Sequence, residues 1–236
     1  MSAAKLTAAL TSVDWNANIA TFIGHADLVE RIAASGFRLA LWARQFENTD
    51  KGEHGNPALC FIREMQIAGH LVATTCALAC YKSTASSLRT IVETALYYTY
   101  FRVHPVELGT LVRNPKWFIS KDDVIEYHKL HTEGFAENQQ KVQVVGQLNP
   151  WYSRMSAIIH GQLPGQWVTQ VSIADTKPDL PTLEKIADEF EQCVRIVDAL
   201  FFCTAGNELW DYFSHVARHA LIKGMPGDVK AALKLA

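Results

Sequence analysis

The stretch SSLRTIVETALYY, residues 86–98, separates polar from apolar side chains as an amphipathic helix does. Arg89, Glu93 and Tyr97 recur at intervals of four and form one line on such a helix. Its other face carries the apolar side chains of Leu88, Ile91, Val92, Ala95 and Leu96. The stretch therefore predicts a core helix over about 84–103, which ends at His104-Pro105 because the residue before proline disfavours the helical region.

The same periodicity recurs along the chain, whereas strand signals are scarce. We expect further helices over residues 26–48, 57–80, 120–132, 136–145, 150–160 and 182–221. The first should turn Leu28, Ile32, Phe37, Leu39 and Leu41 toward a core. Breaks are expected at residues 48–57, near Lys82-Ser83 and at Gly206, and a short strand at 167–173. The pattern predicts an all-α, up-and-down helical bundle.

Length and composition favour one domain over residues 1–236, since no stretch is typical of a flexible linker. We divide it into an N-terminal helical extension (1–56), a core bundle (57–223) and a C-terminal tail (224–236). Hydrophobic residues make up 49% of the chain, enough for a sizeable core. The formal net charge of −2 argues against broad, charge-driven nucleic-acid binding, although a local basic patch stays compatible with it.

The cysteines and the apolar segments indicate a cytoplasmic protein. The five cysteines show neither zinc-finger nor disulfide spacing, which fits a reducing compartment. The beginning of the chain, MSAAKLTAAL, lacks the features of a signal peptide. The most apolar run, residues 71–81, is too short to span a bilayer, and we expect no membrane association.

The segment WYSRMSAIIHG, residues 151–161, has the residues best suited to chemistry. Asn149 is expected to cap a short helix with Pro150 at its first position, and Gly161 to end it. Arg154 offers a permanent cation for phosphate, and His160 a base that titrates near neutrality. On one helix these two residues lie about 9 Å apart along the axis and about 120° apart around it. Two copies related by a two-fold axis would bring them together, and Ser156, one turn before His160, could assist.

Arg154 and His160 resemble the R-x(4–6)-H signature of the HEPN superfamily of bacterial defence and toxin systems. Residues 86–98 more weakly resemble an earlier core helix of these proteins, which makes Glu93 a further candidate site residue. The resemblance implies a HEPN-like homodimer with metal-independent endoribonuclease activity and a site shared between two copies. It implies an RNA substrate, no cofactor, a role in antiviral defence or growth arrest, and an antitoxin or defence-system partner. One departure is Met155, where many active members have a polar residue.

Other interpretations of these residues stay open. The signature is short enough to arise by chance, and Arg63 with His70 matches it too. If the match is accidental, Arg154 caps a neighbouring helix and His160 merely ends its own. The alternative function is a catalytically silent dimeric scaffold or partner-binding subunit of the HEPN fold. Glu93 either orients Arg154 or His160, or belongs to a solvated face. The histidine pairs His128/His131 and His215/His219, the latter pair with Asp211, suggest a metal enzyme less strongly, because a third and fourth ligand cannot be assigned.

Overall fold

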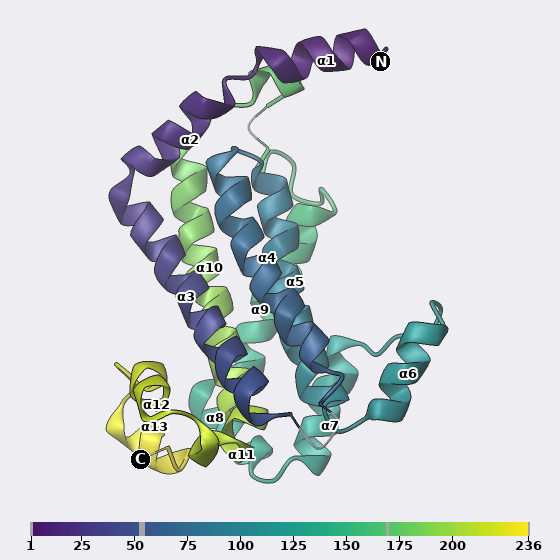
Figure 1. The fold of residues 1–236 in the computed structure, drawn as a ribbon, viewed down its shortest axis with the longest axis vertical. Coiled ribbons are helices and arrows are strands. Elements are labelled where there is room, and N and C mark those ends of the chain that lie inside the picture. The colour runs from purple at the N-terminus through teal and green to yellow at the C-terminus, as the bar shows by residue number, and fades with distance from the viewer. Residues whose placement is uncertain (1, 52–54, 169, 236) are drawn as a thin grey trace.

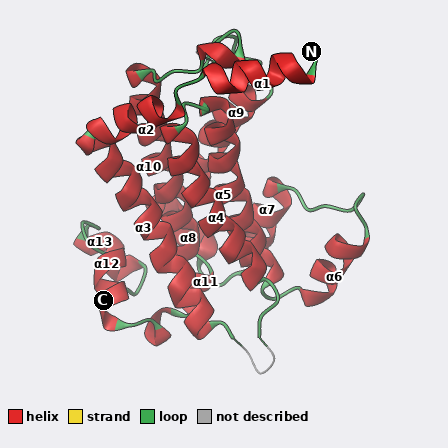
Figure 2. Ribbon diagram, turned by 45° about the horizontal axis from the view of Figure 1, so that its top comes forward, coloured by secondary structure: helices red, strands yellow, loops and turns green. Residues whose placement is uncertain are grey.

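The structure is a computed structural model that describes residues 2–51, 55–168 and 170–235, and within these ranges it contains helices and no strand (Figures 1 and 2). Five long helices form the body: α3 (Ala26–Thr49), α4 (Leu59–Ala77), α5 (Tyr81–Phe101), α9 (Val144–Ile159) and α10 (Leu180–Phe202). Successive long helices alternate in direction, as Figure 1 shows. The all-helical class and the up-and-down arrangement expected from the sequence are confirmed.

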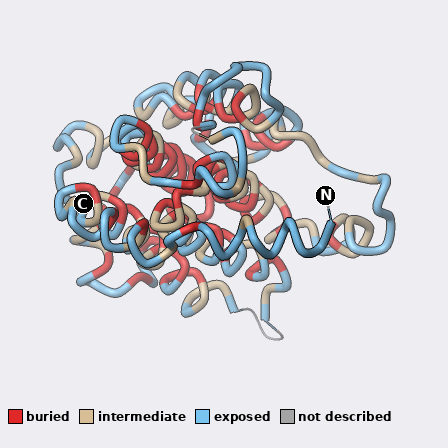
Figure 3. The backbone as a smooth tube through the Cα atoms, turned by 90° about the horizontal axis from the view of Figure 1, so that it is seen from above, coloured by how far each residue is buried: buried red, intermediate tan, exposed pale blue. Residues whose placement is uncertain are grey.

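Shorter helices surround this body. They are α1 (Ala3–Ser12), α2 (Trp15–Gly24), α6 (Pro105–Arg113), α7 (Lys121–His131), α8 (Phe135–Val142), α11 (Ala205–Glu208), α12 (His215–Leu221) and α13 (Gly227–Ala232). Two 3-10 turns, Ile173–Asp175 and Trp210–Tyr212, complete the described elements. The buried residues lie mainly in the middle of the bundle (Figure 3). Helix α1, at the N-terminal end, has no buried residue.

Aromatic side chains of α3 and α10 form the centre of the core. The Trp42 ring lies 5.5 Å from that of Phe46 and 5.2 Å from that of Phe201, and its indole donates to Asp198 at 2.6 Å. Gly206 packs against this cluster so closely that a β-carbon would lie 2.6 Å from the Phe201 carbonyl oxygen. The core thus includes α3 and extends to Leu233 and Leu235 near the C-terminal end.

Several expected boundaries were wrong. The break before α5 lies at residues 78–80, where Ala79 takes a left-handed φ of 56°, so Lys82 and Ser83 belong to the first turn of α5. No strand occurs in the described part of 167–173, with residue 169 outside the described residues. Phe37 is 69% exposed, because it lies about 200° around the helix from the buried Leu39.

The largest correction concerns the helix that carries Arg154. It begins at Val144, after the left-handed residue Gln143, and continues through Pro150, so Asn149 is not its cap. Its end was predicted correctly, since Gly161 follows with a φ of 69°. The break in 182–221 falls at Cys203–Thr204, two residues before Gly206.

Candidate functional site on α5 and α9

One face of α9 is buried, and this burial explains why an apolar residue, Met155, follows Arg154. Trp151, Met155 and Ile158 are buried among the core side chains, and Met155 is fully inaccessible to water. The identity of the residue after Arg154 therefore follows from packing, because a polar side chain there would need a buried partner. Arg154 and Tyr152 lie on the two opposite flanks of this buried face.

Arg154 forms an ion pair with α10. Its Nε and Nη2 donate to the two carboxylate oxygens of Glu189 at 2.7 and 2.9 Å. The hydrogen bond to Glu189 raises the pKa of Arg154, whose side chain remains 42% exposed. The Arg154 guanidinium is thus accessible to solvent, but the Glu189 carboxylate already accepts from the two N–H groups that would bind a phosphate.

His160 ends α9 and is exposed. Its backbone N–H donates to the Ser156 carbonyl at 2.9 Å, and among the described residues its ring has no hydrogen-bond partner. Lys82 of α5 lies close by, with Nζ 3.8 Å from the position that a β-carbon on Gly161 would take. Lys82 also lines a hollow of about 280 Å³ together with Trp167 of the loop that follows His160. A lysine that lines this hollow therefore lies next to Gly161, the residue that follows the exposed His160.

Glu93 belongs to a polar cluster between α5 and α9. Its Oε1 accepts from Arg89 Nε at 2.9 Å and from the Tyr152 hydroxyl at 2.6 Å. Arg89 also donates to the Tyr152 hydroxyl and stands 4.6 Å from the centre of its ring, while Lys121 Nζ lies 5.6 Å from the same centre. Burial, with the hydrogen bond to Glu93, raises the pKa of Tyr152 to about 12. Tyr152 is thus a neutral phenol whose ring lies close to two cations.

A second cavity, of about 380 Å³, opens at this cluster. Arg89, Lys121 and Tyr152 line it, together with Tyr97 and Phe118, and the Phe118 side chain is 71% exposed. Exposed aromatic rings beside cations are the elements with which proteins stack unpaired bases and hold phosphates.

The expected site residues thus divide into two groups. Glu93 faces α9, but it contacts Tyr152 rather than Arg154. The Ser156 hydroxyl donates to the Tyr152 carbonyl at 2.8 Å. Tyr152, Ser156 and His160 follow one another at intervals of four on the flank toward α5, and Arg154 lies on the other flank. Tyr152, Lys121 and Lys82 were not among the site residues predicted from the sequence. The spacing of four residues between Tyr152 and Ser156 is a signal that could have revealed Tyr152.

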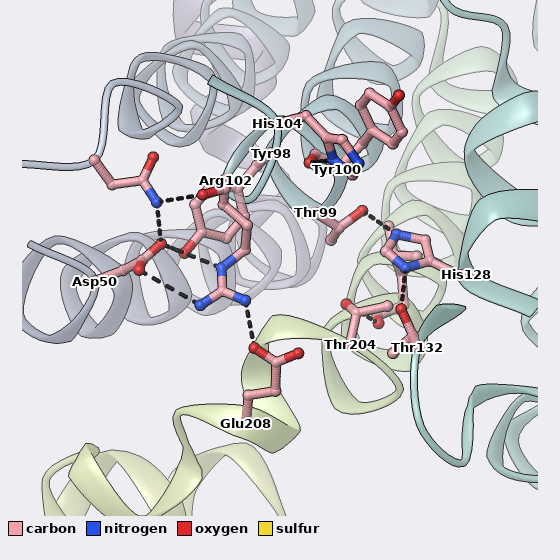
Figure 4. Close-up of polar contacts among 12 residues, drawn as sticks. Asp50, Tyr98, Thr99, Tyr100, Arg102, His104, His128, Thr132, Thr204 and Glu208 are labelled. Carbon is pink, nitrogen blue, oxygen red and sulfur yellow. Dashed lines mark hydrogen bonds and ion pairs between the residues drawn. The ribbon is translucent and has the colours of Figure 1, made fainter. Parts of the chain in front are cut away.

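The histidines considered as metal ligands have other surroundings. His128 is buried, with Nδ1 2.8 Å from the Thr132 hydroxyl and Nε2 2.9 Å from the Thr99 hydroxyl (Figure 4). His215 and His219 are exposed. Over residues 2–51, 55–168 and 170–235, no group of three or more His, Cys, Asp or Glu side chains is placed to hold a metal ion.

A buried ion pair lies near His128. Arg102, the residue that follows α5, contacts Asp50 and reaches Glu208 of α11 (Figure 4). Asp50 also accepts from the Tyr98 hydroxyl at 2.8 Å. The Arg102 and Asp50 side chains are only 10% and 13% exposed. This network joins the ends of three helices and leaves no charge of the pair directed at a cavity, so we assign it to the fold.

Comparison of the chain with protein-family models, with curated proteins and with solved structures found no match. Within the described residues, no helix has the length and apolar character that crossing a membrane requires. The geometry of α5 and α9 is therefore the basis on which a function can be proposed.

Proposed function

We propose that the protein is a metal-independent endoribonuclease of the HEPN type, which cleaves RNA through attack of its 2′-hydroxyl. One observation carries the proposal. Three cations of neighbouring helices, Lys121 of α7 and Arg89 and Lys82 of α5, lie along the flank of α9 that leads from Tyr152 to the exposed His160. Lys121 and Arg89 also contact Asp122 and Glu93. Tyr152 and His160 are eight positions apart, which is about 12 Å along a helix. A base at the end of a row of cations is the arrangement that cleavage of a phosphodiester needs.

In the proposed reaction His160 accepts the proton of the 2′-hydroxyl. The 2′-oxygen then bonds to the adjacent phosphorus, and the bond from phosphorus to the 5′-oxygen breaks. The protonated His160 imidazole then supplies a proton to the leaving 5′-oxygen. The products are a 2′,3′-cyclic phosphate and a 5′-hydroxyl. Cations stabilise the negative charge that develops on the phosphoryl oxygens. No metal takes part in any of these steps.

Arg154 enters this proposal through a second copy of the chain. Its flank faces away from the row of cations, so Arg154 of one protomer would reach the phosphate held beside His160 of the other. The proposal therefore includes a homodimer whose axis passes close to α9. A strictly monomeric species at micromolar concentration in light scattering would remove Arg154 from the site. The physiological setting we propose is antiviral defence or growth arrest, with an antitoxin or defence-system partner, in the cytoplasm.

The test is cleavage of mixed RNAs in EDTA by wild type and by variants. His160→Ala and Arg154→Ala should each lower the rate by ~10²-fold or more, the usual scale for a general base or a charge-stabilising donor. Arg154→Lys should also be poor, because an ammonium lacks the planar two-point contact. Arg63→Ala and His70→Ala provide matched controls from the second occurrence of the signature. Equal cleavage of DNA, or full activity of the two site variants, would refute the mechanism.

The alternative is a catalytically silent helical scaffold that binds a partner protein. The bidentate pair between Arg154 and Glu189 favours it, because the pair satisfies the arginine within one protomer. Wild type that cleaves no RNA, while Arg154→Ala lowers thermal stability, would support this alternative. Activity that increases on Glu189→Gln would instead indicate that the ion pair restrains a functional arginine.

A further inference from the structure

A cavity larger than either of the two hollows at α5 and α9 lies away from them. It is a groove of about 970 Å³ between α3 and α10, closed at one end by the segment from Leu221 to Val229. α3 and α10 run in the same direction, because Arg31 pairs with Glu191 and Arg38, two turns later, pairs with Asp198. The groove extends from Asp27 to Arg38, which are 11 residues and about 16 Å apart along α3.

The floor of the groove is apolar, and two of its arginines, Arg31 and Arg38, pair with carboxylates of α10. Val194, Ala199 and Phe202 of α10 line it together with Leu221. Arg38 is fully engaged, since it contacts Asp198 at 2.6 Å and donates to the carbonyls of Ala220 and Leu221. The bonds from Arg38 hold the start of the closing segment against α3, so the groove is present without a ligand. Concave apolar sites of this volume with a few polar groups are typical of small-molecule binding.

The charges of the groove that form no ion pair are distributed unevenly along it, and one of them, Arg195, donates from Nε and Nη2 to Gln192 Oε1 at 3.0 and 2.7 Å. Lys141, Arg195 and Lys223 line it and, among the described residues, form no ion pair with a carboxylate. Lys223 lies in the closing segment, and Arg195 lies on α10 between the levels of Glu191 and Asp198. Asp27 and Glu30, likewise without a cationic partner in the described chain, belong to the first turns of α3 at the other end. Cations without an ion pair thus line the groove from its middle to the closing segment, and carboxylates without one lie where α3 begins.

We propose that this groove binds an amphipathic monoanion, a molecule with a linear apolar body and a single carboxylate. The apolar floor accommodates the chain, and the cations near the closed end hold the carboxylate. Asp27 and Glu30 disfavour a second negative charge at the far end of the chain. The site therefore distinguishes a fatty carboxylate from both an uncharged alcohol and a dicarboxylate of equal length.

The test is titration calorimetry of the full chain with decanoate, decanol and sebacate, each below the concentration at which it aggregates. Decanoate should bind roughly fivefold or more tightly than the other two, the scale of a few partly exposed ion pairs. Ala34→Trp places an indole in the groove from an exposed position of α3 and should weaken decanoate binding roughly tenfold or more. Circular dichroism confirms that each variant is folded.

Charge variants test the assignment of the carboxylate. Arg195→Glu combined with Lys223→Glu should weaken decanoate to the affinity of decanol or below it, because the two new carboxylates repel the ligand, and should leave decanol unchanged. Lys177→Glu, at an exposed position outside the groove, is the matched control and should bind as wild type does. Equal affinities for decanoate and decanol, unchanged binding by folded Ala34→Trp, or no heat from any probe at millimolar concentration would each overturn the proposal.

Discussion

The buried His128 should make the protein unstable in mild acid. Its side chain lies between α5 and α7, with both ring nitrogens on threonine hydroxyls. Burial lowers the pKa of His128 to about 4, and the positive charges of His104 and Arg102 act in the same direction. The folded protein therefore keeps this ring neutral at a pH where the unfolded chain protonates it.

The magnitude follows from the difference between the two states. Above pH 6.5, the ordinary value of histidine, neither state binds the proton and His128 costs nothing. Between pH 6.5 and about 4 only the unfolded chain binds it, so the free energy of unfolding falls by about 1.4 kcal/mol per pH unit. The full loss is about 3 kcal/mol, a large fraction of the stability of a typical domain.

His128→Gln isolates this contribution, because glutamine is neutral throughout and can retain one hydrogen bond. The variant should be less stable than wild type by about 1–2 kcal/mol at pH 7.5, the value of one buried hydrogen bond. This difference in the free energy of unfolding should shrink as the pH falls below 6.5, and it should reach zero or change sign by pH 4. Urea unfolding followed by circular dichroism at each pH measures it, with the exposed His131→Gln on the same helix as control. A stability difference between wild type and His128→Gln that stays constant from pH 7.5 to 4 would refute the reasoning.

Three further predictions concern local interactions. Tyr152→Phe removes the hydroxyl bond to Glu93 and should lower the free energy of unfolding by about 1–2 kcal/mol; an unchanged melting temperature would contradict it. A double-mutant cycle on Arg154 and Glu189 should give a coupling of about 1 kcal/mol or less because the arginine is 42% exposed, and a much larger coupling would count against this assignment. Gly36→Ala in α3 meets no atom within 4 Å and should stabilise the protein by about 0.5–1 kcal/mol in urea unfolding, whereas destabilisation would contradict an open helical position.

Local sequence determined most of the helices, because their signals depend on neighbouring residues. Residues 26–49 form a helix as expected, and Ser120 with Asp123 forms the capping box that the sequence indicates. Pro105 begins α6, and Gly161 ends α9. Each of these features is decided within one or two turns of chain, where side-chain spacing and backbone preference suffice.

The start of α9 was missed because Pro150 gives a strong local signal for a first turn, which the bundle overrides. Val144 and Leu148 are buried against the core, and their packing extends the helix toward its N-terminal side through the proline. A single missing N–H bond costs less than exposing these apolar side chains would. Sequence periodicity cannot weigh these two terms, since the burial depends on distant helices.

In the candidate site, too, the sequence identified the polar groups and the packing of the helices decided their partners. The sequence alone identified Arg154, His160, Ser156 and Glu93 as polar groups on two helices. Only the packing of α5 against α9 paired Glu93 with Tyr152, and only the approach of α10 placed Glu189 on Arg154. The partners of a charged side chain depend on which flank of its helix each neighbour covers. Residues 35 or more positions apart in the chain decide that, and so the tertiary structure, not the spacing of residues, determined what each group contacts.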